Sequence, residues 1–310
     1  MPTAAHRARI AVLPDGVRTF LADAVEAGGG VLSDPDDAVA LVWTETAAAE
    51  PLGRVLDDHA GLHWVQLPWA GVEPYVDVIR GHADRTWTCG KGVYAEPVAE
   101  HALALALAAM RGLGHYARAT SWTGQRGHNL LGARVTIVGG GGIAESLLRL
   151  FGPFGCDVTV VRRNPRPMAG ATRVVDGDRL DEALAGAELV VLALPLLPGT
   201  VGLIDRRRLE LLAPDACLVN VARGRHVVTA DLVGALGDGT LGSAGLDVTD
   251  PEPLPDGHPL WALPNAIVTP HTANTQEMAL PLLSARITDN VRRWIADEPL
   301  VGPVDPIAGY

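Results

Sequence analysis

The chain is short of lysine and cysteine and contains no long apolar run. Lys91 is the only lysine, and it does not stand in a GxxxxGK[ST] context, which excludes a phosphate-binding loop of that kind. Cys89, Cys156 and Cys217 form no CxxC pair, so neither a disulfide framework nor a metal site is expected, and we expect a reducing cytoplasm. No apolar run approaches the roughly 20 residues that span a bilayer, so no membrane association is expected.

Basic residues are outnumbered by acidic ones, and the net charge of the 310-residue chain is −11. An acidic surface repels phosphate backbones, which argues against nucleic acid as a partner. The apolar stretch 10–13 near the start is far too short for a signal peptide. The length allows two domains or one large one.

Short apolar runs alternate with helix-like stretches over the first hundred residues, which predicts a parallel, open α/β sheet. The expected strands are residues 8–13, 38–43, 63–67 and 86–89, and the expected helices are residues 17–27 and 52–59. A long alanine- and leucine-rich helix, residues 96–112, follows with Pro97 in its first turn and is expected to link two domains.

A second alternating series predicts a doubly wound dinucleotide-binding domain with six strands. The expected strands are residues 134–138, 157–161, 189–194, 216–221, 242–247 and 266–269. The expected helices are residues 143–154, 180–185, 206–212 and 230–236. The last helix, residues 275–296, is long enough to return to the first domain.

A glycine-rich turn at residues 139–144 fits the pattern GxGxxG/A. It directly follows an apolar strand and opens an amphipathic helix, which is the context that dinucleotide binding requires. Gly139 permits the tight turn, Gly141 lets the backbone approach a pyrophosphate, and Ala144 is small enough for close helix–strand packing. The alternative interpretation is a plain glycine turn without a ligand.

The second strand of this unit ends in arginines where an NAD-specific site has an acid. Arg162, Arg163 and Arg166 follow it, and no carboxylate is present. Guanidinium groups can bind a 2′-phosphate, which an acid would repel. We therefore expect NADP(H) to be preferred, with NAD(H) possible. The alternative is that these arginines are solvated loop residues.

Three later motifs, at residues 219–224, 245–254 and 268–273, join the glycine turn in one family pattern. Together with residues 63–72 and 93–101, they resemble the D-isomer-specific 2-hydroxyacid dehydrogenase family over nearly the whole chain. Within that family, residues 220–228 and 304–310 are similar to bacterial NADPH-dependent glyoxylate/hydroxypyruvate reductases.

The resemblance implies a catalytic trio, and the chemistry of the residues agrees with it. Arg223 can bind the carboxylate and carbonyl of a 2-oxo acid as a planar cation. His271 can supply a proton near neutral pH, and Glu252 can orient its imidazole and stabilise the positive charge. Taken singly, each of these residues could instead be a surface charge or a structural side chain.

The remaining site residues are expected at the strand ends and in one loop of the first domain. The resemblance assigns the nicotinamide end of the cofactor to Asp247 and the substrate carboxylate to backbone N–H groups of Ala70, Gly71 and Val72. Trp69 either faces the substrate or packs in the core. The expected cofactor-binding residues are Gly139, Gly141, Gly142, Ile143, Arg162, Arg163, Pro195, Val221 and Asp247.

The expected architecture is a Rossmann cofactor domain, residues 99–274, and a flavodoxin-like substrate domain, residues 1–98 and 275–310, with a cleft between them. The expected activity is reduction of a small 2-oxo acid such as glyoxylate or hydroxypyruvate to the D-2-hydroxy acid. The family likeness suggests a homodimer. The alternative function is a dinucleotide-sensing binding protein, because some corepressors resemble the same family.

Overall fold

A computed structural model describes residues 8–45 and 49–307. Residues 1–7 and 308–310, at the ends of the predicted substrate domain, lie outside the described residues. Residues 308–310 are also the last three of the segment that is similar to the reductases. The chain divides into two compact units. One comprises the residues up to Tyr94 together with those from Thr275 onward, and the other is Ala95–Asn274. No helix in the described part is both long and apolar enough to cross a membrane.

The first unit contains a five-stranded parallel sheet with the strand order β2-β1-β3-β4-β5. Its strands are β1 (Arg9–Leu13), β2 (Val31–Leu32), β3 (Ala40–Trp43), β4 (Trp64–Gln66) and β5 (Thr86–Thr88). Side chains of β3 alternate between two cores: Ala40 and Val42 face one, whereas Leu41 and Trp43 face the other. Both faces are therefore buried, as is typical of a parallel sheet.

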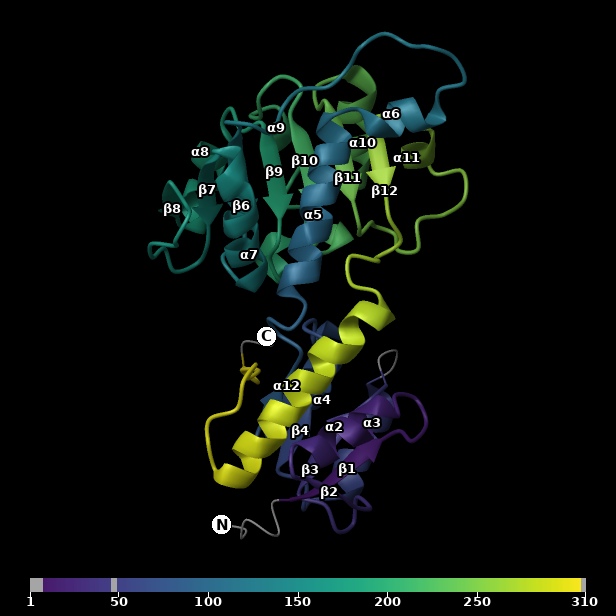
Figure 1. Ribbon diagram of the computed structural model, residues 1–310, viewed down its shortest axis with the longest axis vertical. Helices are drawn as coiled ribbons and strands as arrows, with labels where there is room; N and C mark the ends of the chain where they lie inside the picture. Colours follow the sequence, from purple (N-terminus) through teal and green to yellow (C-terminus); the bar gives the residue numbers. More distant parts are fainter. Residues whose placement is uncertain (1–7, 46–48, 308–310) are drawn as a thin grey trace. The chain divides into compact units, whose positions relative to one another are not determined.

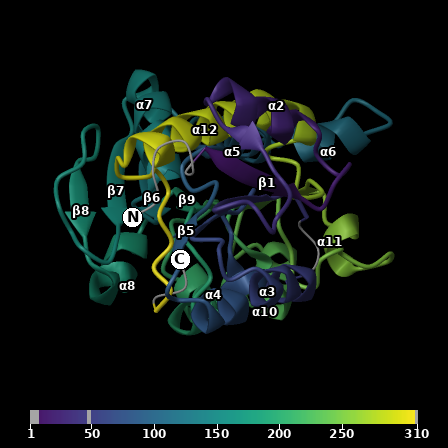
Figure 2. The ribbon, with the colours of Figure 1, turned by 90° about the horizontal axis from the view of Figure 1, so that it is seen from below.

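Helices cover both faces of this sheet (Figure 1). On one face lie α2 (Phe20–Ala27) and α12 (Gln276–Ala296), which run side by side (Figure 2). Leu283, Ile287 and Val291 recur every four residues, so they form one buried stripe on α12, each contributing about 1.5–3 kcal/mol. On the other face lie α3 (Glu50–Asp58) and α4 (Val76–Gly81).

A buried cluster of neutral polar side chains, here called the amide cluster, ties α12 to this sheet. Trp64 Nε1 donates to Thr88 Oγ1 at 2.8 Å, and the Thr88 hydroxyl donates to Gln66 Oε1 at 2.8 Å. Asn290 Nδ2 donates to the same Gln66 oxygen at 2.9 Å, and Asn290 Oδ1 accepts from Val301 N at 2.8 Å. The buried polar groups thus satisfy one another.

The second unit contains a seven-stranded parallel sheet with the order β12-β11-β10-β9-β6-β7-β8. Its strands are β6 (Arg134–Val138), β7 (Asp157–Val161), β8 (Arg173–Val175), β9 (Leu189–Leu192), β10 (Cys217–Asn220), β11 (Ser243–Leu246) and β12 (Ala266–Val268). The order reverses at β6 and β9, which is the doubly wound arrangement of dinucleotide-binding domains. The predicted fold class of two parallel-sheet α/β domains is confirmed.

Helices also cover both faces of the second sheet. On one face lie α5 (Ala95–Met110) and α7 (Gly142–Phe151), with α6 (Leu113–Arg118) following α5. The other face is covered by α8 (Leu180–Leu184), α9 (Arg206–Leu209), α10 (Thr229–Asp238) and α11 (Pro259–Ala262). Short 3₁₀ turns lie at Glu73–Tyr75, Gly152–Phe154, Gly177–Arg179, Pro198–Thr200 and Gly224–His226.

The structure corrects several predicted elements. The second sheet has seven strands rather than six, because the short edge strand β8 was missed. The two exposed residues of β2 and the short helices α4, α6 and α11 were also missed. The helix predicted at residues 17–27 begins only at Phe20, after a turn in which Gly16 has a φ of +77°.

Candidate active site

The glycine-rich turn between β6 and α7 has no room for side chains at its first position. Gly139 has a φ of +120°, and a Cβ built there would lie 2.0 Å from Ala193 O. Gly141 precedes α7, and a Cβ built there would meet nothing within 4 Å. Ala144 is fully buried against the sheet. An open helix N-terminus beside a small-residue turn fits a dinucleotide pyrophosphate.

Arg162 lies across this turn. A Cβ built on Gly140 would come within 2.8 Å of Arg162 Cβ and Cδ and 2.9 Å of its Nε, so the arginine side chain occupies the space above Gly140. Arg163 and Arg166 are exposed in the same loop. The arginine-rich segment therefore adjoins the turn, with Arg162 as its nearest part.

The other predicted cofactor residues follow the carboxyl ends of neighbouring strands or open α7. Pro195 is exposed after β9, and Val221 is buried directly after β10. Gly142 and Ile143 form the half-buried first turn of α7. Carboxyl ends of parallel strands meet at one edge of a sheet, which is where such sheets bind ligands.

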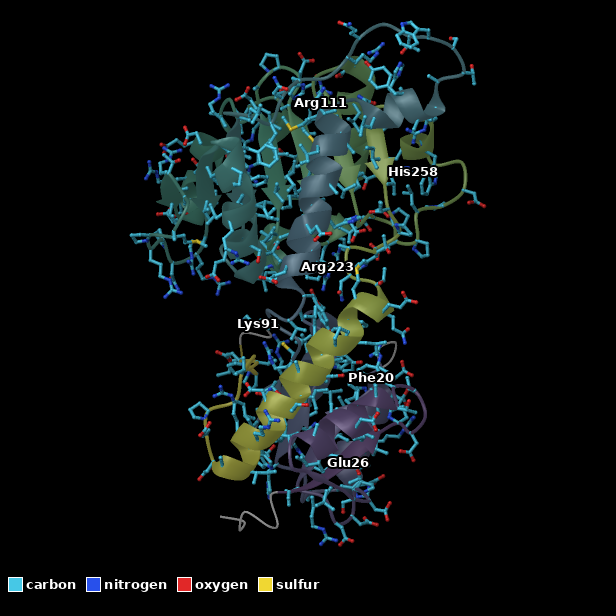
Figure 3. All side chains as sticks on the ribbon, in the orientation of Figure 1. Phe20, Glu26, Lys91, Arg111, Arg223 and His258 are labelled. Carbon is cyan, nitrogen blue, oxygen red and sulfur yellow. The ribbon has the colours of Figure 1, made fainter. Side chains whose placement is uncertain are left out.

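Arg223 stands three residues beyond β10, in a loop held by Asn220 at the strand end (Figure 3). Asn220 Oδ1 accepts from Ala222 N at 3.0 Å, and its Nδ2 donates to Arg223 O at 2.9 Å. A Cβ built on Gly224 would lie 1.9 Å from Thr249 O. Glycine at 224 therefore lets the Arg223 loop contact the segment that leads to Glu252.

Glu252 and His271 form a close pair. His271 Nδ1 lies 2.6 Å from Glu252 Oε1, and Thr249 N donates to Glu252 Oε2 at 3.3 Å. The His271 side chain is 52% exposed and the Glu252 side chain 41%, so a ligand can reach both. With Nδ1 engaged by the carboxylate, Nε2 is the ring nitrogen left to face a substrate.

The backbone of His271 is held in an unusual conformation. Its φ is +51°, in the left-handed region that costs a non-glycine residue free energy. Its N–H donates to Asp247 O at 2.8 Å, and Thr272 N and Ala273 N donate to the Asp247 carboxylate at 2.9 and 3.1 Å. These hydrogen bonds stabilise the turn that presents the imidazole.

Asp247 is the centre of a second buried polar cluster, here called the Asp247 cluster. The Thr269 hydroxyl donates to its Oδ1 at 2.6 Å, and His101 Nε2 lies 3.3 Å from the same oxygen and 2.9 Å from Thr269 Oγ1. Burial alone would raise the carboxyl pKa, but the hydrogen bonds from His101, Thr269 and the two backbone N–H groups outweigh it. The pKa of Asp247 therefore lies below its usual value.

His101 is a residue that sequence reasoning missed, since no catalytic argument pointed to it. No sequence signal marks it, because its place depends on how closely α5 approaches β11. Gly245 lets α5 approach β11, because a Cβ there would lie 2.8 Å from Leu105 Cβ. His101 lies one turn before Leu105, and Asp247 lies two residues after Gly245, so both pairs share a face. By contrast, His226 is fully buried, and His258 lies at the start of α11, apart from Arg223 (Figure 3).

The predicted substrate loop belongs to the first unit and follows β4. Ala70 is exposed, Gly71 is half-buried and Val72 is buried in the core. Trp69 is not a core residue: it is partly exposed, its ring centroid lies 5.5 Å from that of Tyr94, and the Arg18 guanidinium lies over it at 4.7 Å. Arg18 belongs to none of the sequence motifs described above.

The doubly wound sheet, its glycine turn and the Arg223, Glu252 and His271 segments at its carboxyl edge define a class: an oxidoreductase that uses a nicotinamide dinucleotide. Residues 103–273 match the family model "D-isomer specific 2-hydroxyacid dehydrogenase, NAD binding domain". The chain belongs to the D-isomer specific 2-hydroxyacid dehydrogenase family, which confirms the resemblance in its motifs.

Individual relatives are similar to this chain over most of their length. A Corynebacterium melassecola protein called "Uncharacterized protein in proB 3'region" is 36% identical over 93% of this chain and 95% of its own. Glyoxylate/hydroxypyruvate reductase A of Serratia proteamaculans is 32% identical over 87% of each chain. The crystal structure of a family member from Xanthobacter autotrophicus Py2 in complex with NADPH and MES superposes with a TM-score of 0.82 and 28% identity, covering 97% of this chain and 99% of that one.

Proposed function

We propose that this enzyme reduces a small 2-oxo acid, such as glyoxylate or hydroxypyruvate, to the D-2-hydroxy acid with NADPH as the preferred cofactor. The observation that carries the proposal is the 2.6 Å contact between His271 Nδ1 and Glu252 Oε1. It gives the imidazole a fixed orientation and a negatively charged partner, which proton donation to a carbonyl requires. The names of the Serratia proteamaculans relative and of the NADPH-bound family structure support it.

In the proposed reaction, the residues of this chain bind the substrate and move one proton. Arg223 binds the substrate carboxylate and polarises the carbonyl group. His271 donates the proton on Nε2 to the carbonyl oxygen and is left neutral, while Glu252 stabilises the charged imidazole beforehand. The bound dinucleotide supplies the hydride. Backbone N–H groups of Ala70, Gly71 and Val72 are proposed to hold the substrate carboxylate.

The preference for NADPH rests on Arg162 and the absence of an acid at the end of β7. The Arg162 side chain lies over Gly140, next to the turn that is proposed to bind the pyrophosphate. A guanidinium in this place can bind a 2′-phosphate with two parallel hydrogen bonds. We propose that Arg162 and Arg163 provide this contact.

A substrate panel tests the proposed function. The loss of NADPH absorbance is followed with glyoxylate, hydroxypyruvate, pyruvate and longer 2-oxo acids, and kcat/KM is then compared between NADPH and NADH. We expect turnover of at least one acid and a higher kcat/KM with NADPH. No turnover on any acid would favour a dinucleotide-sensing binding protein, and a strong NADH preference would remove the role of Arg162.

The assembly and location of the enzyme are also proposals. We propose a homodimer, on family likeness, and a cytoplasmic location, because Cys89, Cys156 and Cys217 are all unpaired thiols. The 32.5 kDa chain mass makes the first proposal measurable, since a dimer would sediment at twice that mass.

A further inference from the structure

Arg18 lies at the place in the first unit where a doubly wound sheet binds ligands. In the strand order β2-β1-β3-β4-β5, the chain leaves β1 for α2 on one face and leaves β3 for α3 on the opposite face. The carboxyl ends of β1 and β3 therefore lie at the topological switch point of the sheet, which is where sheets of this kind bind ligands. Arg18 is in the connection that follows β1, and Thr44 directly follows β3.

The contacts of Arg18 join three strand ends. Its Nη1 donates to Thr44 O at 3.1 Å, and Thr44 Oγ1 donates to Pro14 O at 2.8 Å. The guanidinium carbon lies 4.7 Å from the centroid of the Trp69 ring, in the loop that follows β4. Tyr94 packs against the same indole, with ring centroids 5.5 Å apart, and donates its hydroxyl to Pro68 O at 2.8 Å.

These contacts leave the positive charge of Arg18 largely uncompensated. Within residues 8–45 and 49–307, no carboxylate forms an ion pair with it, although Glu45 acts on it electrostatically. Partial burial disfavours the cation and lowers the pKa of the guanidinium. An arginine that is partly desolvated, lacks an ion-pair partner in the described chain and lies over an aromatic ring is suited to bind an anion.

We propose that Arg18 and Trp69 form an anion subsite for the group at the far end of the 2-oxo acid, so that the enzyme accepts substrates with a second carboxylate. The inference rests on the proposed function, in which backbone N–H groups of residues 70–72, in the same unit as Arg18, hold the first carboxylate. Arg18, at the neighbouring strand ends, is then available to bind the second carboxylate, on the far side of the oxo carbon.

Two four-carbon acids of matched shape test the subsite. Oxaloacetate carries a carboxylate where 2-oxobutyrate carries a methyl group. We expect Arg18→Met, which keeps the length of the side chain but removes its charge, to lower the ratio of kcat/KM for oxaloacetate to that for 2-oxobutyrate by roughly 10- to 100-fold, the range for hydrogen bonds to charged groups. Arg18→Lys should recover part of the ratio, because it restores the charge without the planar fork.

Arg54→Met is the matched control, because it makes the same chemical change on α3, where Arg54 is exposed and paired with Glu50. It should leave the ratio unchanged. An equal loss of both acids in Arg18→Met would mean that Arg18 only links β1 to β3. An unchanged ratio would likewise overturn the subsite.

A binding measurement separates this inference from the proposed function. D-malate and D-2-hydroxybutyrate, the corresponding 2-hydroxy acids, are titrated calorimetrically into the NADP⁺-loaded protein. The subsite predicts that D-malate binds more tightly than D-2-hydroxybutyrate to the unmodified protein and to Arg54→Met, but not to Arg18→Met. If no 2-oxo acid is reduced, the proposed function fails while this comparison still decides the subsite. Equal affinities in all three proteins would overturn it.

Discussion

The two units each bury a polar cluster beside their sheet, and the clusters differ in charge. The amide cluster of Gln66, Thr88, Trp64 and Asn290 is neutral and joins α12 to the first sheet. The Asp247 cluster holds a carboxylate and joins α5 and β11 to the turn that carries His271. The first arrangement fixes where a helix lies, whereas the second also fixes the conformation of a proposed catalytic residue. The comparison suggests that the amide cluster contributes to stability alone, whereas the Asp247 cluster contributes to both stability and catalysis.

The largest expected effect lies at the residue that the Asp247 cluster presents. His271→Ala removes the proposed proton donor, so we expect kcat to fall by about 10²- to 10⁴-fold, the usual contribution of a general acid. The dissociation constant for NADPH, measured by its fluorescence, should stay within about threefold because the glycine turn is intact. Retained turnover would remove the proton-donor role of His271.

The next effect tests the charge of the Asp247 cluster. Asp247→Asn replaces one accepting oxygen with a donor that must face a backbone N–H or a hydroxyl, which should cost about 2 kcal/mol of stability at pH 7. Because the folded-state pKa of Asp247 lies below its usual value, the stabilisation is fully present above the unfolded pKa of about 3.9 and is lost as the pH falls through the lower folded value.

Thermal unfolding of both proteins across the pH range therefore provides the measurement. The difference in melting temperature between Asp247→Asn and the unmodified protein should shrink as the pH falls below the unfolded pKa of about 3.9. A difference that stays constant with pH would mean that the carboxylate charge contributes nothing. The kcat of Asp247→Asn should also fall, because the turn that carries His271 loses one of the two side-chain oxygens that accept from its backbone.

The amide cluster should show the opposite behaviour. Asn290→Ala removes three hydrogen bonds, to Gln66 and to the backbone of Val301, and should cost about 2 kcal/mol. No group in this cluster titrates in the range, so the cost should not vary between pH 4 and 8, and kcat/KM of the folded enzyme should be unchanged. The exposed substitution Arg54→Ala should cost less than about 0.5 kcal/mol. A fall in kcat/KM with Asn290→Ala would mean that the amide cluster also affects catalysis, contrary to the proposed difference between the clusters.

The smallest expected effect lies outside both clusters, at Gly140. Gly140→Ala places a Cβ against the Arg162 side chain, so the affinity for NADPH should fall by about tenfold while that for NADH is unchanged. Gly141→Ala is the matched control, because a methyl group there faces open space and should weaken both cofactors if the pyrophosphate lies beside it. If Gly140→Ala lowered the affinities for NADPH and NADH equally, Arg162 would not determine the cofactor preference.

The central strands were predictable because both faces of each sheet are buried, so their residues form continuous apolar runs such as residues 189–192. Edge elements carry no such signal. In β2, Val31 and Leu32 are exposed, and β8 is only three residues long. Short helices such as α6 and α11 span too few residues for a periodic pattern.

Candidate site residues can be predicted from sequence where their chemistry and the family motif coincide, but not where the packing of neighbouring elements determines their position. The sequence predicts the trio Arg223, Glu252 and His271, but the observed contact of Glu252 with His271, 19 residues apart, depends on the left-handed backbone of residue 271. His101 and Arg162 reach their neighbours because Gly245 and Gly140 lack side chains, and such close approaches become visible only in three dimensions.

Lys91 offers a site for selective chemical labelling. It is exposed in the connection from β5 to α5, four residues before α5 begins and close to the boundary between the two units, and Arg286 Nη1 donates to its carbonyl oxygen at 3.0 Å (Figure 3). Because the chain has no other lysine, an amine-reactive dye can attach only there and at the N-terminal amine. Without any engineered cysteine, a fluorophore can thus be placed in the connection from β5 to α5.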